Sequence, residues 1–95
     1  MDIFIVVDDL LFKTKIESII KSVNSSITKN IYDSDYIIID LDHKEAFNTL
    51  KKFPEKSLCF CSHLDKEKLD KSKSLGCKNV FPRSLFFDKL RSIIK

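Results

Sequence analysis

Short, uninterrupted apolar runs alternate along the chain with segments whose apolar residues recur every three or four positions. An uninterrupted run is typical of a strand covered on both faces, as in a parallel sheet, whereas the three-to-four spacing is typical of an amphipathic helix. The apolar runs cover residues 3–7, 36–39 and 58–61, and residues 79–81 are predicted to be a further short strand. The pattern therefore predicts an α/β domain built on a parallel sheet.

The segments between these runs predict four helices, which carry signals for their ends. The helical patterns fall within residues 12–23, 42–53, 65–75 and 86–94. Asp9 is placed to cap the first helix, and Asp42 with Glu45 has the spacing of a capping box for the second. Gly76 closes the third helix, and Ser84 is placed to cap the fourth.

Residues 26–32 have a different pattern, in which polar and apolar positions alternate. Ile27 and Ile31 share one face with Lys29 between them, which is typical of an exposed edge strand protected by a charge. A turn is predicted at residues 33–35. Nearly alternating strands and helices with right-handed crossovers predict a single domain over residues 1–95.

Charge is distributed unevenly along the chain. Residues 1–42 carry four Lys and eight acidic residues, a net −4, whereas residues 43–95 carry thirteen Lys or Arg and six acidic residues, a net +7. A solvated lysine-rich surface explains this, including the helical lysines Lys66, Lys68, Lys71 and Lys73. A nucleic-acid adaptor is the less favoured alternative, because the basic stretch 66–78 contains acids and no aromatic residue.

The chain also carries signals about its location. No apolar run approaches the roughly 18 residues needed to cross a bilayer, and the first residues lack the basic leader of a signal peptide. The three cysteines are expected to stay reduced. We therefore expect a cytoplasmic protein without membrane contact.

Polar residues follow the apolar runs, where the strands are expected to end. They are Asp8, Asp9, Asp40, Cys61, Ser62, His63 and Arg83. Ligands bind at the carboxyl edge of open α/β sheets, and a strand order of 2-1-3-4-5 would bring the three aspartates together there. Carboxylates at such short distances repel one another unless a cation lies between them, and oxygen ligands of this kind suit Mg²⁺.

Four segments in this order resemble the receiver domain of two-component response regulators, the CheY-like family. They are Val6-Val7-Asp8-Asp9, residues 35–41 ending in Asp40-Leu41, residues 60–65, and residues 75–83 followed by 87–90. The resemblance implies a flavodoxin-like, three-layer fold with a five-stranded parallel sheet of order 2-1-3-4-5. It also implies that Asp40 accepts a phosphoryl group while Asp8, Asp9 and Asp40 hold Mg²⁺.

The chain departs from the family pattern at three places. Cys61 stands where the family has a Thr or Ser, with Ser62 next to it, and a thiol is a weaker donor than a hydroxyl. Arg83 stands at the family's lysine, and Pro82 precedes this position instead of following it. The segment between Asp9 and Asp40 is too short for the family's second helix, which we expect to be missing or vestigial.

Several of these residues have simpler explanations. Asp9 and Asp42 can be helix caps, and Arg83 can neutralise Asp40. One strand face could present Cys59, Cys61 and His63 to a zinc ion, with Cys77 as a fourth ligand, but buried thiols acting as small hydrophobes explain the cysteines better. Cysteine catalysis with His63 or His43 lacks an orienting third group.

Three functions therefore remain open. The favoured one is a stand-alone pseudo-receiver with a degenerate phosphoacceptor site that acts by protein contact. The alternatives are a functional Mg²⁺-dependent response regulator phosphorylated on Asp40 and the nucleic-acid adaptor. We expect no enzymatic activity beyond self-phosphorylation on Asp40.

The expected contact surface, for a protein partner or a homodimer, is the 65–75 helix, the fifth strand and the last helix. In the last helix, the consecutive residues Leu85, Phe86 and Phe87 cannot all face one core.

Overall fold

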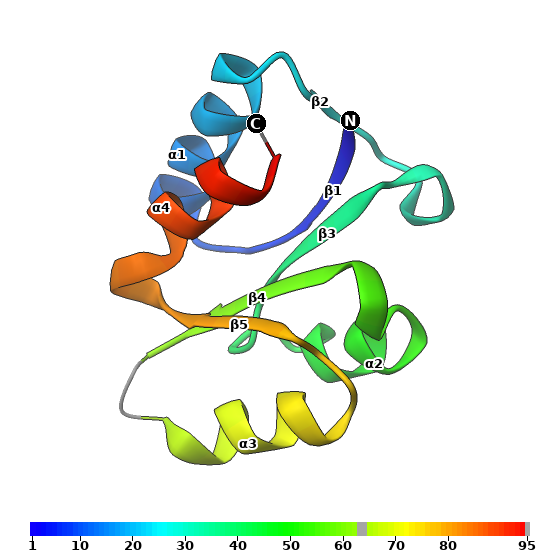
Figure 1. Cartoon of the computed structure of the whole chain (residues 1–95), viewed down its shortest axis with the longest axis vertical. Coiled ribbons are helices and arrows are strands. Elements are labelled where there is room, and N and C mark those ends of the chain that lie inside the picture. The colour runs from blue at the N-terminus through cyan, green and yellow to red at the C-terminus, as the bar shows by residue number, and fades with distance from the viewer. Residues whose placement is uncertain (63–64, 95) are drawn as a thin grey trace.

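A computed structural model describes residues 1–62 and 65–94, which form one parallel sheet with helices on both faces (Figure 1). The strands in this part of the chain are β1 Asp2–Val6, β2 Ser26–Ile27, β3 Tyr36–Asp40, β4 Ser57–Cys61 and β5 Asn79–Pro82. The helices are α1 Leu10–Ser22, α2 Ala46–Lys52, α3 Lys66–Ser74 and α4 Arg83–Ile94. All pairings are parallel and the strand order is β2-β1-β3-β4-β5, so the predicted fold is confirmed.

The sheet separates two hydrophobic cores, because successive residues of a strand point to opposite faces. Ile38 and Phe60 lie in the core beneath α1 and α4, whereas Ile37 and Ile39 lie in the core beneath α2 and α3. All of these side chains are fully buried. Burial on both faces is the reason that the central strands appear in the sequence as uninterrupted apolar runs. None of the helices described is long and apolar enough to cross a membrane.

The helix ends confirm some of the predicted caps and correct others. Asp9 caps α1 by accepting a 3.1 Å hydrogen bond from Phe12 N–H, and Gly76 follows α3 with a φ of +96°, which suits glycine. The predicted cap at Asp42 is wrong, since α2 starts at Ala46 without a side-chain cap. The predicted cap at Ser84 is also wrong, because α4 begins one residue earlier and includes it.

The edge strand predicted over residues 26–32 is much shorter in the structure. Only Ser26–Ile27 pair with β1, and a single 3₁₀ turn, Ile31–Asp33, follows. The Asn30 side chain accepts a hydrogen bond from Tyr32 N–H, and Ser34 Oγ donates to the Ile31 carbonyl. Such local side-chain bonds compete with strand pairing. The crossover from β2 to β3 therefore contains a single 3₁₀ turn and no α-helix. This agrees with the prediction that the family's second helix is missing or vestigial.

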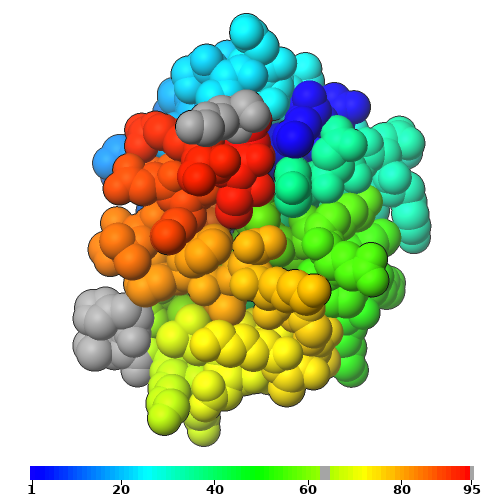
Figure 2. Space-filling view, in the orientation of Figure 1, coloured from blue at the N-terminus to red at the C-terminus, as the bar shows by residue number. Residues whose placement is uncertain are grey.

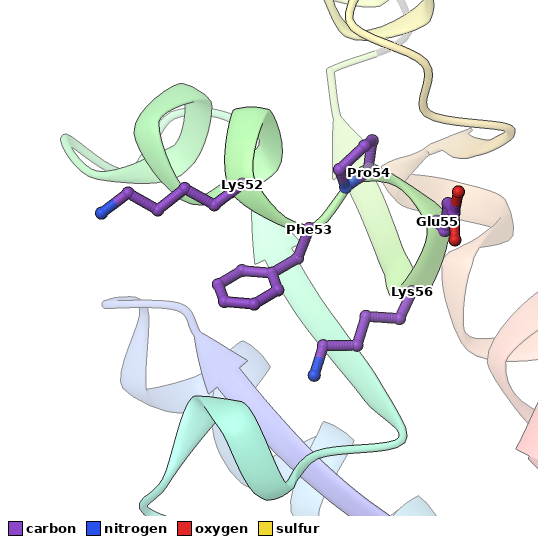
Figure 3. Close-up of a pocket in the computed structure, with 5 residues that line it drawn as sticks. All are labelled: Lys52, Phe53, Pro54, Glu55 and Lys56. Atoms are coloured by element: carbon purple, nitrogen blue, oxygen red, sulfur yellow. The ribbon is translucent and has the colours of Figure 1, made fainter.

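Lys56 ties this crossover to the rest of the fold. Its Nζ donates hydrogen bonds to the carbonyls of Ile31 (3.0 Å) and Ser34 (2.9 Å) and lies 4.9 Å from the centre of the Phe53 ring. Figure 3 shows the side chains of Lys56 and Phe53 alongside each other, with Lys52 extending away from them. A charged donor that satisfies two carbonyls can thus substitute for the hydrogen bonds of a helix in this connection.

Replacement of Lys56 by Met should lower the free energy of unfolding by about 1.5 kcal/mol or more, because it removes two charge-assisted hydrogen bonds. Lys52→Met, at an exposed position nearby, is the matched control and should change stability by less than about 0.5 kcal/mol. Urea unfolding of both variants measures this. Equal stabilities of the two variants would contradict the role given to Lys56.

Candidate functional site

Four aspartates gather at the carboxyl edge of the sheet. Asp8 and Asp9 follow β1, Asp40 is the last residue of β3, and Asp42 lies in the turn after it. They converge because β1 and β3 are adjacent and in register, with Val6 opposite Ile39. We call Asp8, Asp9, Asp40 and Asp42 the acidic edge.

Arg83 supplies positive charge to the acidic edge from the start of α4. Its guanidinium Nη2 lies 3.5 Å from Asp40 Oδ2, and its Nη1 lies 3.7 Å from Asp9 Oδ2. A third carboxylate oxygen, Asp42 Oδ2, is 3.8 Å from Nη2. The prediction that Arg83 reaches Asp40 is therefore confirmed.

Aromatic rings hold the guanidinium in this position. The Arg83 Cζ lies 5.1 Å from the centre of the Phe12 ring and 5.5 Å from that of Phe60. The two rings are themselves packed with centroids 4.5 Å apart. A planar guanidinium stacks favourably on aromatic faces, which restricts the side chain to the side of the sheet edge where the carboxylates are.

The surroundings of Asp40 oppose its ionisation. The residue is only 6% exposed. Burial raises the pKa of its carboxyl above the ordinary value, although the Asp42 N–H, which donates a 2.9 Å hydrogen bond, and the charge of Arg83 act in the opposite direction. The Asp42 N–H and the Arg83 charge thus both stabilise the ionised carboxylate, and burial outweighs them.

Asp8 is engaged differently from the other members of the acidic edge. Its side chain is 82% exposed, and its Oδ1 lies 3.3 Å from His43 Nε2. His43 Nδ1 accepts a hydrogen bond from Glu45 N–H, which leaves Nε2 as the nitrogen that can donate to Asp8. Two carboxylates of the proposed metal site therefore face Arg83, and the third faces His43.

The residues of the acidic edge, as arranged, do not fit a magnesium ion. Within residues 1–62 and 65–94, no group of three His, Cys, Asp or Glu side chains is placed to hold a metal. Arg83 lies beside Asp9 and Asp40, so a divalent cation placed between these carboxylates would be repelled by the guanidinium charge. Magnesium binding by Asp8, Asp9 and Asp40 stays a prediction from the sequence.

The end of β4 contributes a thiol to this edge. Cys61 is fully buried, and burial raises the pKa of its thiol. Ser62 is exposed, and its carbonyl accepts a 3.0 Å hydrogen bond from Asp65 N–H. His63, which the zinc and cysteine-catalysis alternatives require, lies outside the described residues. Cys59, Cys61 and Cys77 are free and buried, in agreement with the prediction that they act as small hydrophobes.

Sequence reasoning missed the role of Lys68. The sequence predicts a solvated helix face for Lys68, but its Nζ pairs with Asp42 and lies 3.5 Å from Asp65 Oδ2. Asp65 also caps α3 by accepting from Lys68 N–H at 3.2 Å. Lys68 thus joins the first turn of α3 to the acidic edge. The three-residue spacing from the cap is a local signal, but the contact with Asp42 depends on the fold.

Asp40→Asn should stabilise the protein near pH 7. Because the pKa of Asp40 is raised in the folded state, the favourable contribution is complete below the ordinary Asp pKa of about 3.9 and is lost as the pH rises through the folded-state pKa. The neutral amide avoids that loss. The advantage of the variant should therefore be present at pH 7 and disappear toward pH 3.

Urea unfolding across this pH range measures the effect. Asp70→Asn, at an exposed position of α3, is the matched control and should show no comparable pH-dependent gain. A variant less stable than the wild type at pH 7 would mean that the ionised carboxylate is better compensated than its burial indicates.

Comparisons with known proteins place this geometry in a known fold. No family model matches the chain, and no curated protein sequence matches it. Among solved structures, the signal receiver domain of a DNA-binding response regulator (merR) from Colwellia psychrerythraea 34H superposes with a TM-score of 0.76 at 17% identity, covering 99% of this chain and 94% of that one. A response regulator receiver domain from Rhodospirillum rubrum gives a TM-score of 0.69 at 15% identity, covering 98% and 90%.

Full-length FixJ from B. japonicum matches over 98% of this chain and 55% of its own length, with a TM-score of 0.77 at 15% identity. At sequence identities this low, the superpositions establish the fold alone. The activity has to be argued from the site. The strand order, the two helical layers and these superpositions agree with the four sequence segments that resemble the CheY-like family. The chain has the fold of response-regulator receiver domains.

Proposed function

We propose that this chain is a receiver-like regulatory domain that acts through protein–protein contact, with a degenerate phosphoacceptor site. The observation that carries the proposal is the position of Arg83, whose guanidinium lies 3.5 Å from Asp40 and 3.7 Å from Asp9. By resemblance to receivers, a metal cation is expected to compensate these carboxylates. Here a side chain of the protein supplies the compensating charge.

The immediate surroundings of Asp40 support the same proposal. A carboxylate that attacks phosphorus must be ionised and reachable, whereas Asp40 is 6% exposed and has a raised pKa. The new anion would also need hydrogen-bond donors, and the buried Cys61 thiol is a weak one. These features favour a domain that kept the receiver fold without its chemistry.

The alternative is a phosphorylatable receiver in which Asp8, Asp9 and Asp40 hold Mg²⁺. It is favoured by the location of all three carboxylates after β1 and β3, at one edge of the sheet. It requires Arg83 to leave the acidic edge. The Arg83 side chain is already 38% exposed, so it can rotate away from the carboxylates into solvent.

The proposed contact surface consists of α3, β5 and α4. Figure 2 shows residues of α3, in yellow, next to those of β5 and α4, in orange and red, on one face of the molecule. β5 is at the edge of the sheet, and each of its residues is half-buried. Leu85 at the start of α4 is 48% exposed, whereas Phe86 is fully buried, which confirms that the aromatic-rich segment cannot face one core. Apolar residues rimmed by charge mark contact surfaces.

The partner we propose is a protein, either a second copy of this chain or another regulator. The three buried free thiols suit a reducing compartment such as the cytoplasm. Nucleic acid is the less favoured partner because acidic residues are interleaved with the lysines of the basic stretch 66–78.

A phosphoryl-mimic titration separates the two functions. Amide NMR spectra of the wild type should show no saturable shift changes on addition of MgCl₂ with beryllofluoride, because Arg83 already neutralises Asp9 and Asp40 and repels a second cation. Asp40→Asn is the control that reports non-specific salt effects. Saturable shifts around Asp40 in the wild type, absent from the variant, would establish the phosphoacceptor function and overturn the proposal.

Leu85→Ser tests the contact surface. Loss of a buried leucine at an interface should raise the dissociation constant of a dimer, or of the complex with a partner, about tenfold. Ile27→Ser on β2, 38% exposed at the opposite edge of the sheet, is the matched control. Sedimentation equilibrium measures the dimer, and capture on immobilised protein measures a partner. If the two variants behave alike, the contact surface lies elsewhere.

A further inference from the structure

Two cysteine sulfurs contact each other beneath α3. Cys59 is in the middle of β4 and Cys77 precedes β5, and their Sγ atoms are 3.6 Å apart. Both residues are buried, with 0% and 3% exposure. The Cys77 sulfur also lies 3.7 Å from the Ser57 carbonyl oxygen and 3.5 Å from that of Asn79. The contact therefore has polar neighbours as well as the apolar core around it.

We propose that Cys59 and Cys77 are a redox-active pair, a modification site at which a peroxide-class oxidant produces a disulfide between β4 and the segment leading into β5. A disulfide has an S–S length of about 2.05 Å, so the sulfurs must approach by roughly 1.5 Å. Cys61 is two residues further along β4, opposite Pro82 in the register, and is therefore a poorer partner for Cys77.

The sequence of steps assigns each sulfur a role. Cys77 is the sulfur that the oxidant reaches first, because its backbone N–H is bonded to the Ser72 carbonyl of α3 and is released when the end of that helix moves; contact with Cys59 also lowers the pKa of the Cys77 thiol. The Cys77 thiolate displaces hydroxide from hydrogen peroxide and becomes a sulfenic acid. The Cys59 sulfur then attacks the sulfenic sulfur, the S–S bond forms, and water leaves with the Cys59 proton. Two thiols and one peroxide thus give one disulfide and two waters.

Access to the buried pair depends on α3. Ser72 is the buried residue of this helix, and the large apolar residues Leu69 in the helix and Leu75 at its C-cap are only half-buried. The Ser72 carbonyl accepts a 3.1 Å hydrogen bond from Cys77 N–H, so displacement of the end of α3 exposes Cys77. Elements with few buried contacts open at low free energy, which gives a small oxidant a route to the sulfur.

The disulfide would restrain the proposed contact surface. The closed loop runs from residue 59 to residue 77 and includes all of α3. A covalent link across a loop of about this length reduces the freedom of the opened state. Oxidation should therefore hold α3 against the sheet. An effect on partner binding would rest on the proposed function, whereas formation of the disulfide and protection of α3 do not.

Oxidation of the full chain with hydrogen peroxide tests the inference. Mass spectrometry without reductant should show loss of two hydrogen atoms, reversed by dithiothreitol, and a linked peptide pair containing Cys59 and Cys77. Amide hydrogen exchange across α3 should slow by on the order of a hundredfold in the oxidised protein. Cys61→Ser is the matched control and should react like the wild type.

Cys59→Ala and Cys77→Ala should each abolish the intramolecular link while they retain the circular dichroism spectrum of the fold. If either variant fails to fold, the linked peptide in the Cys61→Ser protein still decides the matter. Further oxidation of Cys77 without a link, or a link that requires Cys61, would overturn the inference. If amide hydrogen exchange across α3 is unchanged after oxidation, the disulfide does not hold α3 against the sheet. This outcome does not depend on whether a partner is known.

Discussion

The burial of the Asp40 carboxylate among other acidic side chains is the constraint on which the carboxyl edge of the sheet depends. A carboxylate that is 6% exposed requires a compensating charge, because desolvation disfavours its ionised form. Arg83 meets this requirement from the start of α4, and Lys68 extends the same compensation to Asp42 and α3. Charge balance therefore joins the ends of β3, α3 and α4, which are remote in the sequence.

The rest of the fold is held together by apolar packing and by a few hydrogen bonds and ion pairs. Two hydrophobic cores cover both faces of the sheet, as a parallel sheet requires. The crossover between β2 and β3 lacks a helix, and hydrogen bonds from Lys56 hold its single turn in place. α3 has the weakest apolar attachment, so its position depends on the Lys68 ion pairs at one end and on the packing around Cys77 at the other. The helix with the fewest buried contacts is thus the one in the proposed contact surface.

Much of the fold could be predicted from the sequence because buried positions are occupied by apolar residue types. The buried strands appear as apolar runs, and the cap at Asp9 follows from its place before an amphipathic stripe. The pairing of Arg83 with Asp40 followed from strand order alone, since both lie at one sheet edge. The receiver-like order of strands followed from these same runs together with the family resemblance.

The errors share one physical cause, which is that local patterns compete with contacts made only in the folded chain. Asp42 has capping-box spacing, yet it pairs with Lys68 and Arg83 across the fold. Residues 26–32 alternate like a strand, yet the Asn30 side chain closes a turn. Lys68 has the composition of a solvated residue, and only the approach of α3 to the acidic edge gives it partners. No sequence period encodes such contacts.

The central claim is that Arg83 provides the charge that a metal ion would otherwise bring to Asp40. A double-mutant cycle in urea unfolding, with Arg83→Gln, Asp40→Asn and the combined variant, tests it most directly at pH 7 with and without millimolar MgCl₂. The account predicts a favourable coupling energy of about 1 kcal/mol, modest because the pair is partly exposed and 3.5 Å apart. That coupling should be the same in both solutions. A coupling near zero, or a wild-type stability that rises with Mg²⁺, would contradict it.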